Sequence, residues 1–590
     1  MGELLRTRWE KILTGSILLL LAGYLLAIGA GCSDERAGQE AVMVEPPDPH
    51  AILTEHAKRF SKRVEKVTDG VYVAVGYALA NSIMIDTGDG RIIVDTTESL
   101  EAAREIRAEF DRISNGPVVA VIYTHGHPDH VIGTMGFIES GEGDTAVIAH
   151  ETTNHFLSGQ FGLLQPVLNQ RGIRQFGSYL PDEYSTVIGI GPCLRFDHEK
   201  AVPFVFPNRV FADEMTLEVG GEVLHLMHAP GETDDQIMIW MPAKRVLLCG
   251  DNYYPAFPNL YTIRGTSPRP VLRWINSLDM MRLLGAEFLV PSHAEPVYGA
   301  TRIYELLTAY RDAIQYIHDA VVRGANEGKT PAQLVEEIAL PPHLADRPEL
   351  LELYGQVSWS VRAIYDGYLG WFDGNAVNLE PLSSRERAGN IAGLAGGVDK
   401  LVEAARAALQ EEEYQWAAEL ADMILILDQD SAEGREIKIE ALMKMGEATY
   451  NTNARLYYIT AAMELAGALD TASRIGVDAE MARVIPLSMI FEHMTIKLDP
   501  EAAADVEMAA VFNITDTGEV YSIIVRRGVA ELRCHPVVDA DLVINVAAQV
   551  WKEVALGVSN PLTALATGKI KVEGNKVLLM KKFFDLFTTS

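Results

Sequence analysis

The chain is poor in cysteine and in basic residues. Four cysteines occur in 590 residues, at positions 32, 193, 249 and 534, without a C-x-x-C pair or regular spacing. Such a set indicates neither a disulfide framework nor a thiolate zinc site. Lys and Arg number 50 against 81 Asp and Glu, a formal net charge of −31. This acidic excess argues against nucleic acids and anionic membrane surfaces as partners.

Charged residues make up only 22% of the chain and hydrophobic residues 48%, which is typical of a globular protein and excludes a disordered one. A chain of 590 residues is too long for a single hydrophobic core, so several domains are expected. Because the net charge is negative, an anionic substrate would have to be attracted by local positive charge from metal ions and arginines.

One long apolar run stands out near the N-terminus. It extends from Ile12 to Ile28, after the basic residues Arg6, Arg8 and Lys11, and leads into Gly29-Ala30-Gly31-Cys32. This order predicts an export signal over residues 1–32. Ala-Gly-Cys resembles a bacterial lipoprotein cleavage site with Cys32 as the lipidated residue. The alternative is a retained membrane anchor, although the run is short for a membrane span.

Both alternatives place the protein outside the cytoplasm, on the periplasmic side of a bacterial membrane. Contact with the membrane is then expected only through the N-terminal lipid or anchor. Residues 33–50 are acidic and polar and predict a flexible tether.

Metal-competent side chains are concentrated after the apolar run 118–123. His125-Gly126-His127-Pro128-Asp129-His130 places three imidazoles and a carboxylate within six residues, in a chain with only 15 His. Neutral imidazole and carboxylate suit zinc, and manganese or iron as well. One open catalytic site seldom takes four ligands from one loop, so the cluster predicts two ions. The alternative is a polar surface loop.

Three further apolar strands each end near one metal-competent group. The strands are expected at 224–229, 245–250 and 288–292, and they lead to Glu232, Asp251 and His293. Ligands at strand ends are typical of α/β folds, whose sites lie on the loops at one sheet edge. His225 and His228 lie within a strand and are predicted to be packing or supporting residues.

This strand-then-ligand pattern resembles the metallo-β-lactamase fold, an αββα sandwich. Strand 91–94 with Asp95 resembles the early strand that supplies a supporting aspartate. Glu232 stands where that superfamily usually has His, as in the alkylsulfatase family of type III, zinc-dependent sulfatases. Three segments are similar to that family: 75–85 to its opening strand, 259–265 to its anion-binding segment, and 367–375 to its helical-domain signature.

The resemblance implies two zinc ions and assigns their ligands. One ion would take His125, His127 and Glu232, and Asp251 would bridge to the other, whose ligands are Asp129, His130 and His293. Asp129 is also a candidate to orient or deprotonate the attacking water. The chain departs from the family in two places, with Asp251 where Glu is frequent and Gly126 where Ser is common.

Sulfate recognition is expected from arginine, whose planar donors suit a tetrahedral anion. Arg264 matches the family's anion-binding arginine, and Asn259 is a possible further donor. Arg269 is a second candidate, the alternative being a surface charge in a turn between Pro268 and Pro270. Asn252 is a candidate for orienting the ligand loop.

The pattern along the chain predicts three domains. Residues 51–300 are the α/β catalytic domain, with 152–207 as an insertion that either lines the pocket or is a surface excursion. Residues 301–467 are helical, and the resemblance makes them a dimerisation domain of a homodimer. Residues 470–590 are an α+β unit, with a helix expected over 542–556. That unit resembles sterol-carrier-like domains with an apolar pocket, or else is a purely structural appendage.

The expected activity is hydrolysis of an alkyl sulfate ester to alcohol and inorganic sulfate. A metal-bound hydroxide would perform it, because zinc can lower the pKa of bound water to about 7. One alternative is another dinuclear hydrolase, acting on a lactone, thioester, β-lactam or phosphoester. A further alternative is an exported lipid-binding protein with a vestigial hydrolase domain. Chain length and attack at carbon or sulfur stay open.

Overall fold

The computed structural model describes residues 48–138, 145–160, 163–184, 187–194, 205–472 and 479–587. The expected signal segment, most of the tether and Cys32 lie outside these residues. No helix in the described ranges is both long enough and apolar enough to cross a membrane.

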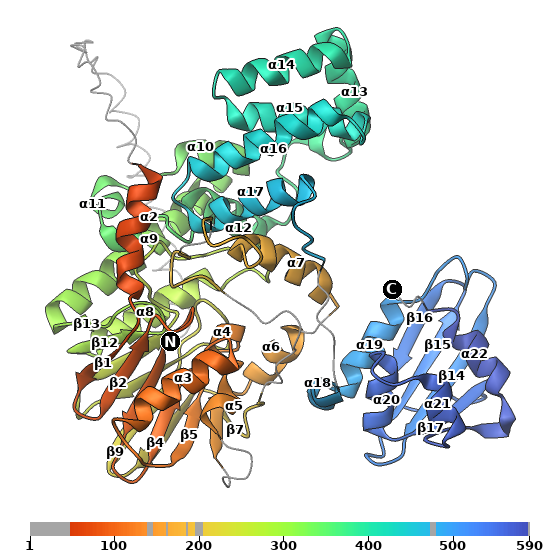
Figure 1. Ribbon diagram of the computed structural model, residues 1–590, viewed down its shortest axis with the longest axis horizontal. Helices are drawn as coiled ribbons and strands as arrows, with labels where there is room; N and C mark the ends of the chain where they lie inside the picture. The colour runs from red at the N-terminus through yellow and green to blue at the C-terminus, as the bar shows by residue number, and fades with distance from the viewer. Residues whose placement is uncertain are drawn as a thin grey trace, which may run out of the picture. The chain divides into compact units, whose positions relative to one another are not determined.

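Two stacked sheets form the first half of the protein (Figure 1). The first sheet keeps the order of the chain, with strands β1 (Arg63–Thr68), β2 (Val71–Val75), β3 (Ser82–Asp86), β4 (Arg91–Val94), β5 (Val118–Ile122), β6 (Ala146–His150) and β7 (Arg209–Phe211). The second runs in reverse order from β13 to β8, with strands β8 (Glu214–Val219), β9 (Glu222–His228), β10 (Ile237–Met241), β11 (Val246–Gly250), β12 (Phe288–Pro291) and β13 (Val297–Tyr298). Their inner faces share one apolar core, where Val73 and Ile122 of the first sheet and Leu248 of the second are fully buried.

Helices cover the outer faces of both sheets. On the first lies α3 (Leu100–Asp111), which begins at the cap Ser99 and buries Ile106 and Phe110. On the second lie α8 (Val271–Leu283) and α9 (Ala300–Asn326), with Trp274 of α8 in the core on that side. The predicted αββα sandwich is therefore confirmed.

A helical region follows the sandwich, as predicted. Its helices are α10 (Pro331–Glu337), α11 (Pro342–Ala345), α12 (Val357–Leu369), α13 (Ser384–Ala395), α14 (Val398–Gln410), α15 (Tyr414–Leu427), α16 (Ala432–Glu447) and α17 (Thr452–Leu465). Between β6 and β7, the expected insertion contains α6 (Thr153–Gln160) and α7 (Gln165–Phe176). An ion pair of 2.6 Å between Arg174 and Glu464 joins α7 to α17, so the insertion is fixed to the helical region.

The last region is α+β, also as predicted. Its sheet has the order β16-β15-β14-β17-β18, from strands β14 (Glu507–Ile514), β15 (Val520–Arg526), β16 (Val529–Arg533), β17 (Leu542–Val546) and β18 (Ile570–Val572). Its helices are α18 (Ala479–Val484), α19 (Leu487–Ile496), α20 (Ala548–Ala555), α21 (Pro561–Ala566) and α22 (Val577–Phe584). The aromatic residues Phe491, Phe512 and Trp551 pack together in its core. The likeness to sterol-carrier domains stays a prediction.

Two element predictions were wrong. Residues 75–85 are not one strand, because the chain turns at Gly76, where φ is +78°, and enters β3 only at Ser82. Residues 542–556 do not form one helix, because Leu542, Ile544 and Val546 are buried in alternation. This period of two belongs to a strand, and the helix α20 begins only at Ala548.

Candidate metal centre

The loop that follows β5 presents most of the predicted ligands. Pro128 opens the short helix α4 (Pro128–Val131), whose first turn carries Asp129 and His130. His125 and His127 precede it in the loop, and the side chain of His125 is fully buried. The sequence therefore turns four ligand side chains toward one place at the end of a buried strand.

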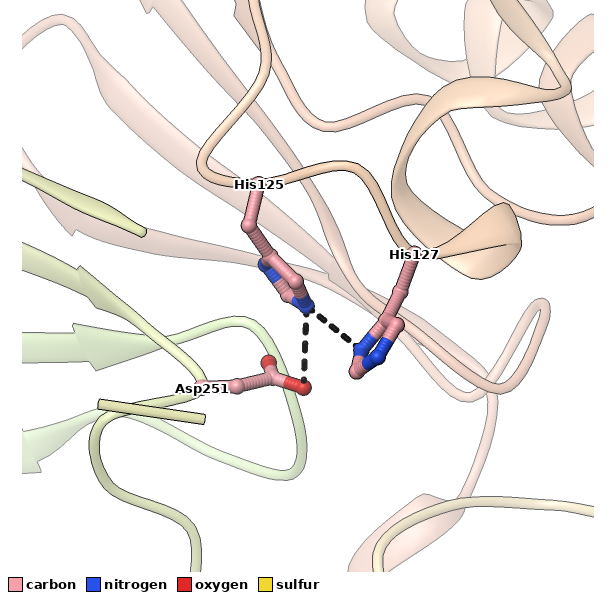
Figure 2. A group of neighbouring side chains, drawn as sticks. All are labelled: His125, His127 and Asp251. Carbon is pink, nitrogen blue, oxygen red and sulfur yellow. Dashed lines mark hydrogen bonds and ion pairs between the residues drawn. The ribbon is translucent and has the colours of Figure 1, made fainter. Parts of the chain in front are cut away.

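The structure gathers the predicted ligands into two groups. His125, His127 and Asp251 form one (Figure 2), and Asp129, His130 and His293 form the other. In each group the candidate ligand atoms all lie within 4.8 Å of one another. Residues from both sheets meet here, because β5 belongs to the first and β11 and β12 to the second.

Asp251 lies between the two groups. Its Oδ2 atom is 3.7 Å from His125 Nε2 of its own group. The same oxygen is 3.5 Å from His130 Nε2 and 3.2 Å from His293 Nε2 of the other group. This position is compatible with the predicted bridging role, although aspartate has a shorter side chain than glutamate.

Hydrogen bonds set the orientation of two imidazoles. His130 Nδ1 lies 2.8 Å from the Asp95 carboxylate, and His293 Nδ1 lies 2.9 Å from the Leu79 carbonyl oxygen. Both partners can only accept here, so each Nδ1 carries the proton and each Nε2 presents a lone pair. Supporting bonds of this kind orient metal-binding histidines in proteins.

The donor set fits a cation. In the part of the chain that the structure describes, His130 Nε2 and Asp251 Oδ1 are buried without a hydrogen-bond partner. Burial opposes charge on His130, but the carboxylates of Asp251, Asp129 and Asp95 raise its pKa well above the usual value. Burial also opposes charge on His293, but the carboxylate of Asp251 outweighs it and raises the pKa of His293 above the usual value. The surroundings therefore favour positive charge between these residues, and buried N and O ligands suit a divalent metal.

Glu232 lies beside this centre and has other partners. Its Oε1 is 2.7 Å from Arg269 Nη1, and its Oε2 accepts a hydrogen bond of 3.0 Å from the Tyr254 hydroxyl. Within the described ranges it is in neither ligand group. Its assignment to the ion of His125 and His127 stays a prediction. Asn252 fixes the loop that leads to Glu232, because its Nδ2 donates a hydrogen bond of 2.7 Å to the Ala229 carbonyl.

Arg264 stands next to the first ligand group. Its Nη2 is 3.3 Å from His127 Nε2, and its Nη1 donates to Thr262 Oγ1 at 2.7 Å. Burial lowers the pKa of Arg264 below the usual value. Because its charge is poorly compensated there, an anion bound beside Arg264 would be stabilised.

Arg269 and Asn259 are buried in the same region. The alternative of a surface charge was wrong, since the Arg269 side chain is 3% exposed and paired with Glu232. Asn259 is 1% exposed, and both polar atoms of its side chain lack a hydrogen-bond partner among the described residues. A buried amide without partners is costly unless a ligand satisfies it.

Two polar residues at this site were not predicted. Gln175 Oε1 accepts hydrogen bonds of 2.9 Å from both Thr262 Oγ1 and the Arg264 backbone N–H, so Gln175 fixes the segment that carries Arg264. Tyr254 binds Glu232. Tyr254 follows Asp251 closely and could have been found from that spacing, whereas no local signal marks Gln175.

His225 and His228, which were predicted to be packing or supporting residues, lie outside the two ligand groups. His225 Nδ1 is 3.2 Å from Thr216 Oγ1. His228 donates from Nε2 to the Asp234 carbonyl at 2.7 Å and stacks on His150, with ring centroids 3.8 Å apart. Neither is in a ligand group of the described residues.

Comparison with known proteins matches three domain families along the chain. Residues 75–293 match the metallo-beta-lactamase superfamily, 330–468 match "alkyl sulfatase dimerisation", and 476–590 match "alkyl sulfatase C-terminal". A linear primary-alkylsulfatase of Pseudomonas sp. (strain ATCC 19151) is 37% identical over 520 residues, covering 85% of this chain and 98% of the relative. An (R)-specific secondary-alkylsulfatase of Pseudomonas sp. is 27% identical over 539 residues, covering 88% and 80%.

A solved structure is similar over most of the chain. It is that of the stereoselective inverting sec-alkylsulfatase Pisa1 from Pseudomonas sp., with a TM-score of 0.84 and 26% identity, covering 91% of this chain and 87% of that one. The sandwich, the helical region and the C-terminal region thus occur together in both proteins. The chain belongs to the alkylsulfatase family of the metallo-β-lactamase superfamily.

Proposed function

We propose that this protein hydrolyses an alkyl sulfate ester to an alcohol and inorganic sulfate. The observation that carries the proposal is the partly buried Arg264 guanidinium, 3.3 Å from His127 of the first ligand group. An anion-binding group therefore lies directly beside the residues that would hold metal. The names of the relatives, which are primary and secondary alkylsulfatases, support the same substrate class.

We propose two zinc ions as cofactors, with manganese or iron suited to the same N and O ligands. His125, His127 and Asp251 would hold one ion, with Glu232 as a further ligand, and Asp129, His130 and His293 would hold the other. When bound, such ions supply an acidified water and positive charge that offsets the sulfate. Asp251 would contact both ions.

The chain's own residues then bind and orient the ester. Arg264 Nη2 faces the ligand group and can donate to a sulfate oxygen. Asn259 can donate from its unpartnered Nδ2, and Arg269 holds the backbone carbonyl of Asn259 through Nη1. Asp129 is the most open of the carboxylate ligands, with 14% of its side chain exposed against 3% for Asp251. We assign to its Oδ2 the orientation or deprotonation of the attacking water.

The test compares Arg264→Ala with Arg112→Ala, which removes a 71% exposed side chain paired with Glu109 on the surface. Sulfate release from dodecyl sulfate is measured together with bound metal. We expect release to fall about 100-fold or more in Arg264→Ala, with metal retained, and to be unchanged in the control. A lactone or other neutral substrate would depend much less on Arg264.

Two outcomes would contradict the proposal, one its substrate and the other its dependence on metal. About two metals bound without sulfate release from primary or secondary esters would favour a lactone, thioester, β-lactam or phosphoester. Sulfate release that survives removal of the metal by a chelator would contradict the metal-dependent reaction.

We propose that the protein is a homodimer through the helical region. Around the end of α12 the structure exposes apolar side chains close together in sequence, namely Tyr368 58%, Leu369 55%, Trp371 75%, Val377 76%, Leu379 54% and Leu382 54%. Contiguous exposed apolar surface is typical of protein interfaces, and this stretch lies within the matched dimerisation domain, residues 330–468. A mass of one chain in light scattering would contradict the dimer.

We further propose export and lipid attachment at Cys32, based on the N-terminal sequence alone. Cys32→Ser should abolish incorporation of radiolabelled palmitate in a bacterial host. Cleavage and secretion in the absence of any lipid label would instead indicate an ordinary signal peptide.

A further inference from the structure

Apolar side chains of the α6–α7 insertion surround the place where Arg264 meets the ligand loop. The ring of Phe156, in α6, packs edge-on against His127 with centroids 5.5 Å apart. The ring of Phe176, at the end of α7, lies 5.8 Å from Arg264 Cζ. Phe156 and Phe176 are both partly exposed, so the predicted anion site has two apolar neighbours, one beside His127 and one beside Arg264.

One face of α7 continues from this place to the surface. Gln175 Oε1 binds the Arg264 backbone N–H at 2.9 Å, and Arg171 Nη2 donates to the Ile263 carbonyl at 2.7 Å. A Cβ atom on Gly265 would lie 3.2 Å from Leu168 Cδ2, so Leu168 contacts the same segment. Leu164 is the N-cap residue of α7, and its carbonyl oxygen accepts a hydrogen bond of 3.0 Å from the Leu168 N–H, so Leu164 lies at the outer end of the helix, one turn before Leu168.

This face becomes more apolar and more exposed with distance from Arg264. Gln175 is buried and Leu168 is half-buried, whereas Leu164 is 64% exposed. The neighbouring Val167 is 44% exposed. At 1.5 Å per residue, the eleven steps from Gln175 to Leu164 span roughly 16 Å. A polar end beside Arg264 and an apolar end at the surface match a molecule with an anionic head and a long alkyl chain.

Gly126 is required for one part of this wall. A Cβ atom at Gly126 would lie 2.8 Å from Phe156 Cδ1, closer than real Cβ contacts. A serine at this position would therefore displace Phe156 or the loop. Glycine at this position lets the aromatic ring pack against the ligand loop at His127.

We propose that Phe156, Leu168 and Leu164 form the subsite for a long alkyl chain of the substrate. The chain passes from the sulfate beside Arg264 over Leu168 to Leu164 at the surface. The assignment rests on the proposed function for the position of the sulfate. It makes these three side chains determinants of chain-length specificity, because each methylene they cover strengthens binding by up to about four-fold.

The test uses dodecyl and hexyl sulfonate, which carry the anionic head but no ester bond and so cannot be hydrolysed as esters. Their dissociation constants are measured by calorimetry on the metal-loaded full chain, below the micelle-forming concentration. The variant is Leu164→Gln/Leu168→Gln, because Gln retains helix propensity. The matched control is Leu283→Gln, which replaces a 75% exposed leucine at the end of α8.

We expect the wild type to bind the dodecyl compound more tightly than the hexyl compound. This preference should fall about ten-fold in the double variant and stay unchanged in the Leu283→Gln control. Phe156→Ala is a second variant, in case the double variant does not fold, and should reduce the preference as well. An unchanged preference in folded Leu164→Gln/Leu168→Gln and in Phe156→Ala would overturn the subsite.

Sulfate release from dodecyl and hexyl sulfate separates the two proposals. Release with a chain-length preference that all variants keep would overturn the subsite and leave the proposed function intact. A sulfonate preference that the variants lose, without sulfate release by the wild type, would support an alkyl subsite and contradict the proposed reaction.

Discussion

Asp95 is the residue on which the orientation of the second ligand group depends. Its fully buried carboxylate accepts four hydrogen bonds, from Thr124 N (2.8 Å), Thr124 Oγ1 (2.8 Å), His130 Nδ1 (2.8 Å) and Ser292 Oγ (2.7 Å). Thr124 follows β5 of the first sheet and Ser292 follows β12 of the second. One carboxylate therefore joins the strand ends from which the ligands project.

The perturbation is Asp95→Asn, which keeps the shape but replaces one acceptor by a donor. Asp95 Oδ1 faces the Thr124 N–H, and Oδ2 faces His130, Ser292 and the Thr124 hydroxyl. If the amide oxygen stays toward the Thr124 N–H, the NH₂ group faces His130 Nδ1. His130 must then move its proton to Nε2, where it blocks the lone pair meant for the metal. The flipped amide instead places its NH₂ group against the Thr124 backbone N–H, so that two donors face each other.

Loss of such a supporting bond lowers metal affinity about 10- to 100-fold in other proteins, which corresponds to about 1.4–2.7 kcal/mol. We expect this loss in Asp95→Asn, mainly at the second of the two proposed metal sites, which contains His130. The assay is competition with a graded series of chelators, with bound metal counted by mass spectrometry. The control is Asp69→Asn, because the Asp69 side chain is 94% exposed and pairs with Lys66 on the surface. If folded Asp95→Asn binds metal as tightly as the wild type, the proposed role of Asp95 in orienting His130 is contradicted.

Three further predictions concern stability and assembly. Burial lowers the pKa of His56 from 6.5 to about 4, so the unfolded state takes up the proton first as the pH falls. The resulting loss of about 3 kcal/mol should occur between pH 6.5 and 4. It should be absent in His56→Gln, whose amide can still donate to the Gly189 carbonyl that His56 Nε2 contacts at 2.7 Å; equal pH dependence of unfolding in both proteins would argue against it. Trp371→Ser should weaken the dimer in light scattering at low concentration, whereas Leu578→Ser, at a 79% exposed position outside the helical region, should not; equal dissociation would rule out this interface. Leu248→Ala should lower the free energy of unfolding by about 2–5 kcal/mol, measured in urea, since Leu248 is fully buried between the sheets; a change below 1 kcal/mol would indicate that the core collapses around the gap.

Strand ends and helical stretches were predictable because they depend on local pattern. The apolar run 118–123 became β5, and the stretch 301–467, expected to be helical, contains the helices α10 to α17. The errors arose where one local pattern spans two elements. At Gly76 a positive φ turns the chain within an apolar stretch, and at 542–546 a short strand directly precedes a helix.

The site was predicted as a set of residues but not as a set of contacts. The predicted ligands that follow β5, β11 and β12 lie in the two groups, whereas Glu232, which follows β9, lies in neither group of described residues. The burial of Arg269 and its ion pair with Glu232 could not be predicted from the sequence. Between two prolines this residue resembled a surface turn, whereas the structure buries it against Glu232 at 2.7 Å, because the pair comes from segments 37 residues apart that only folding brings together.

Residue types and their order along the chain were enough to predict the candidate ligands, the strand ends that carry them and the family to which the chain belongs. These follow from residue types and short-range periodicity, which are local properties. The three-dimensional structure was needed to see which nitrogen of His130 faces the other ligand residues, that Asp251 lies between the two groups, and that Phe156 packs edge-on against His127. Each depends on atoms from different sheets or from the insertion, and their distances are fixed by packing and not by spacing along the chain.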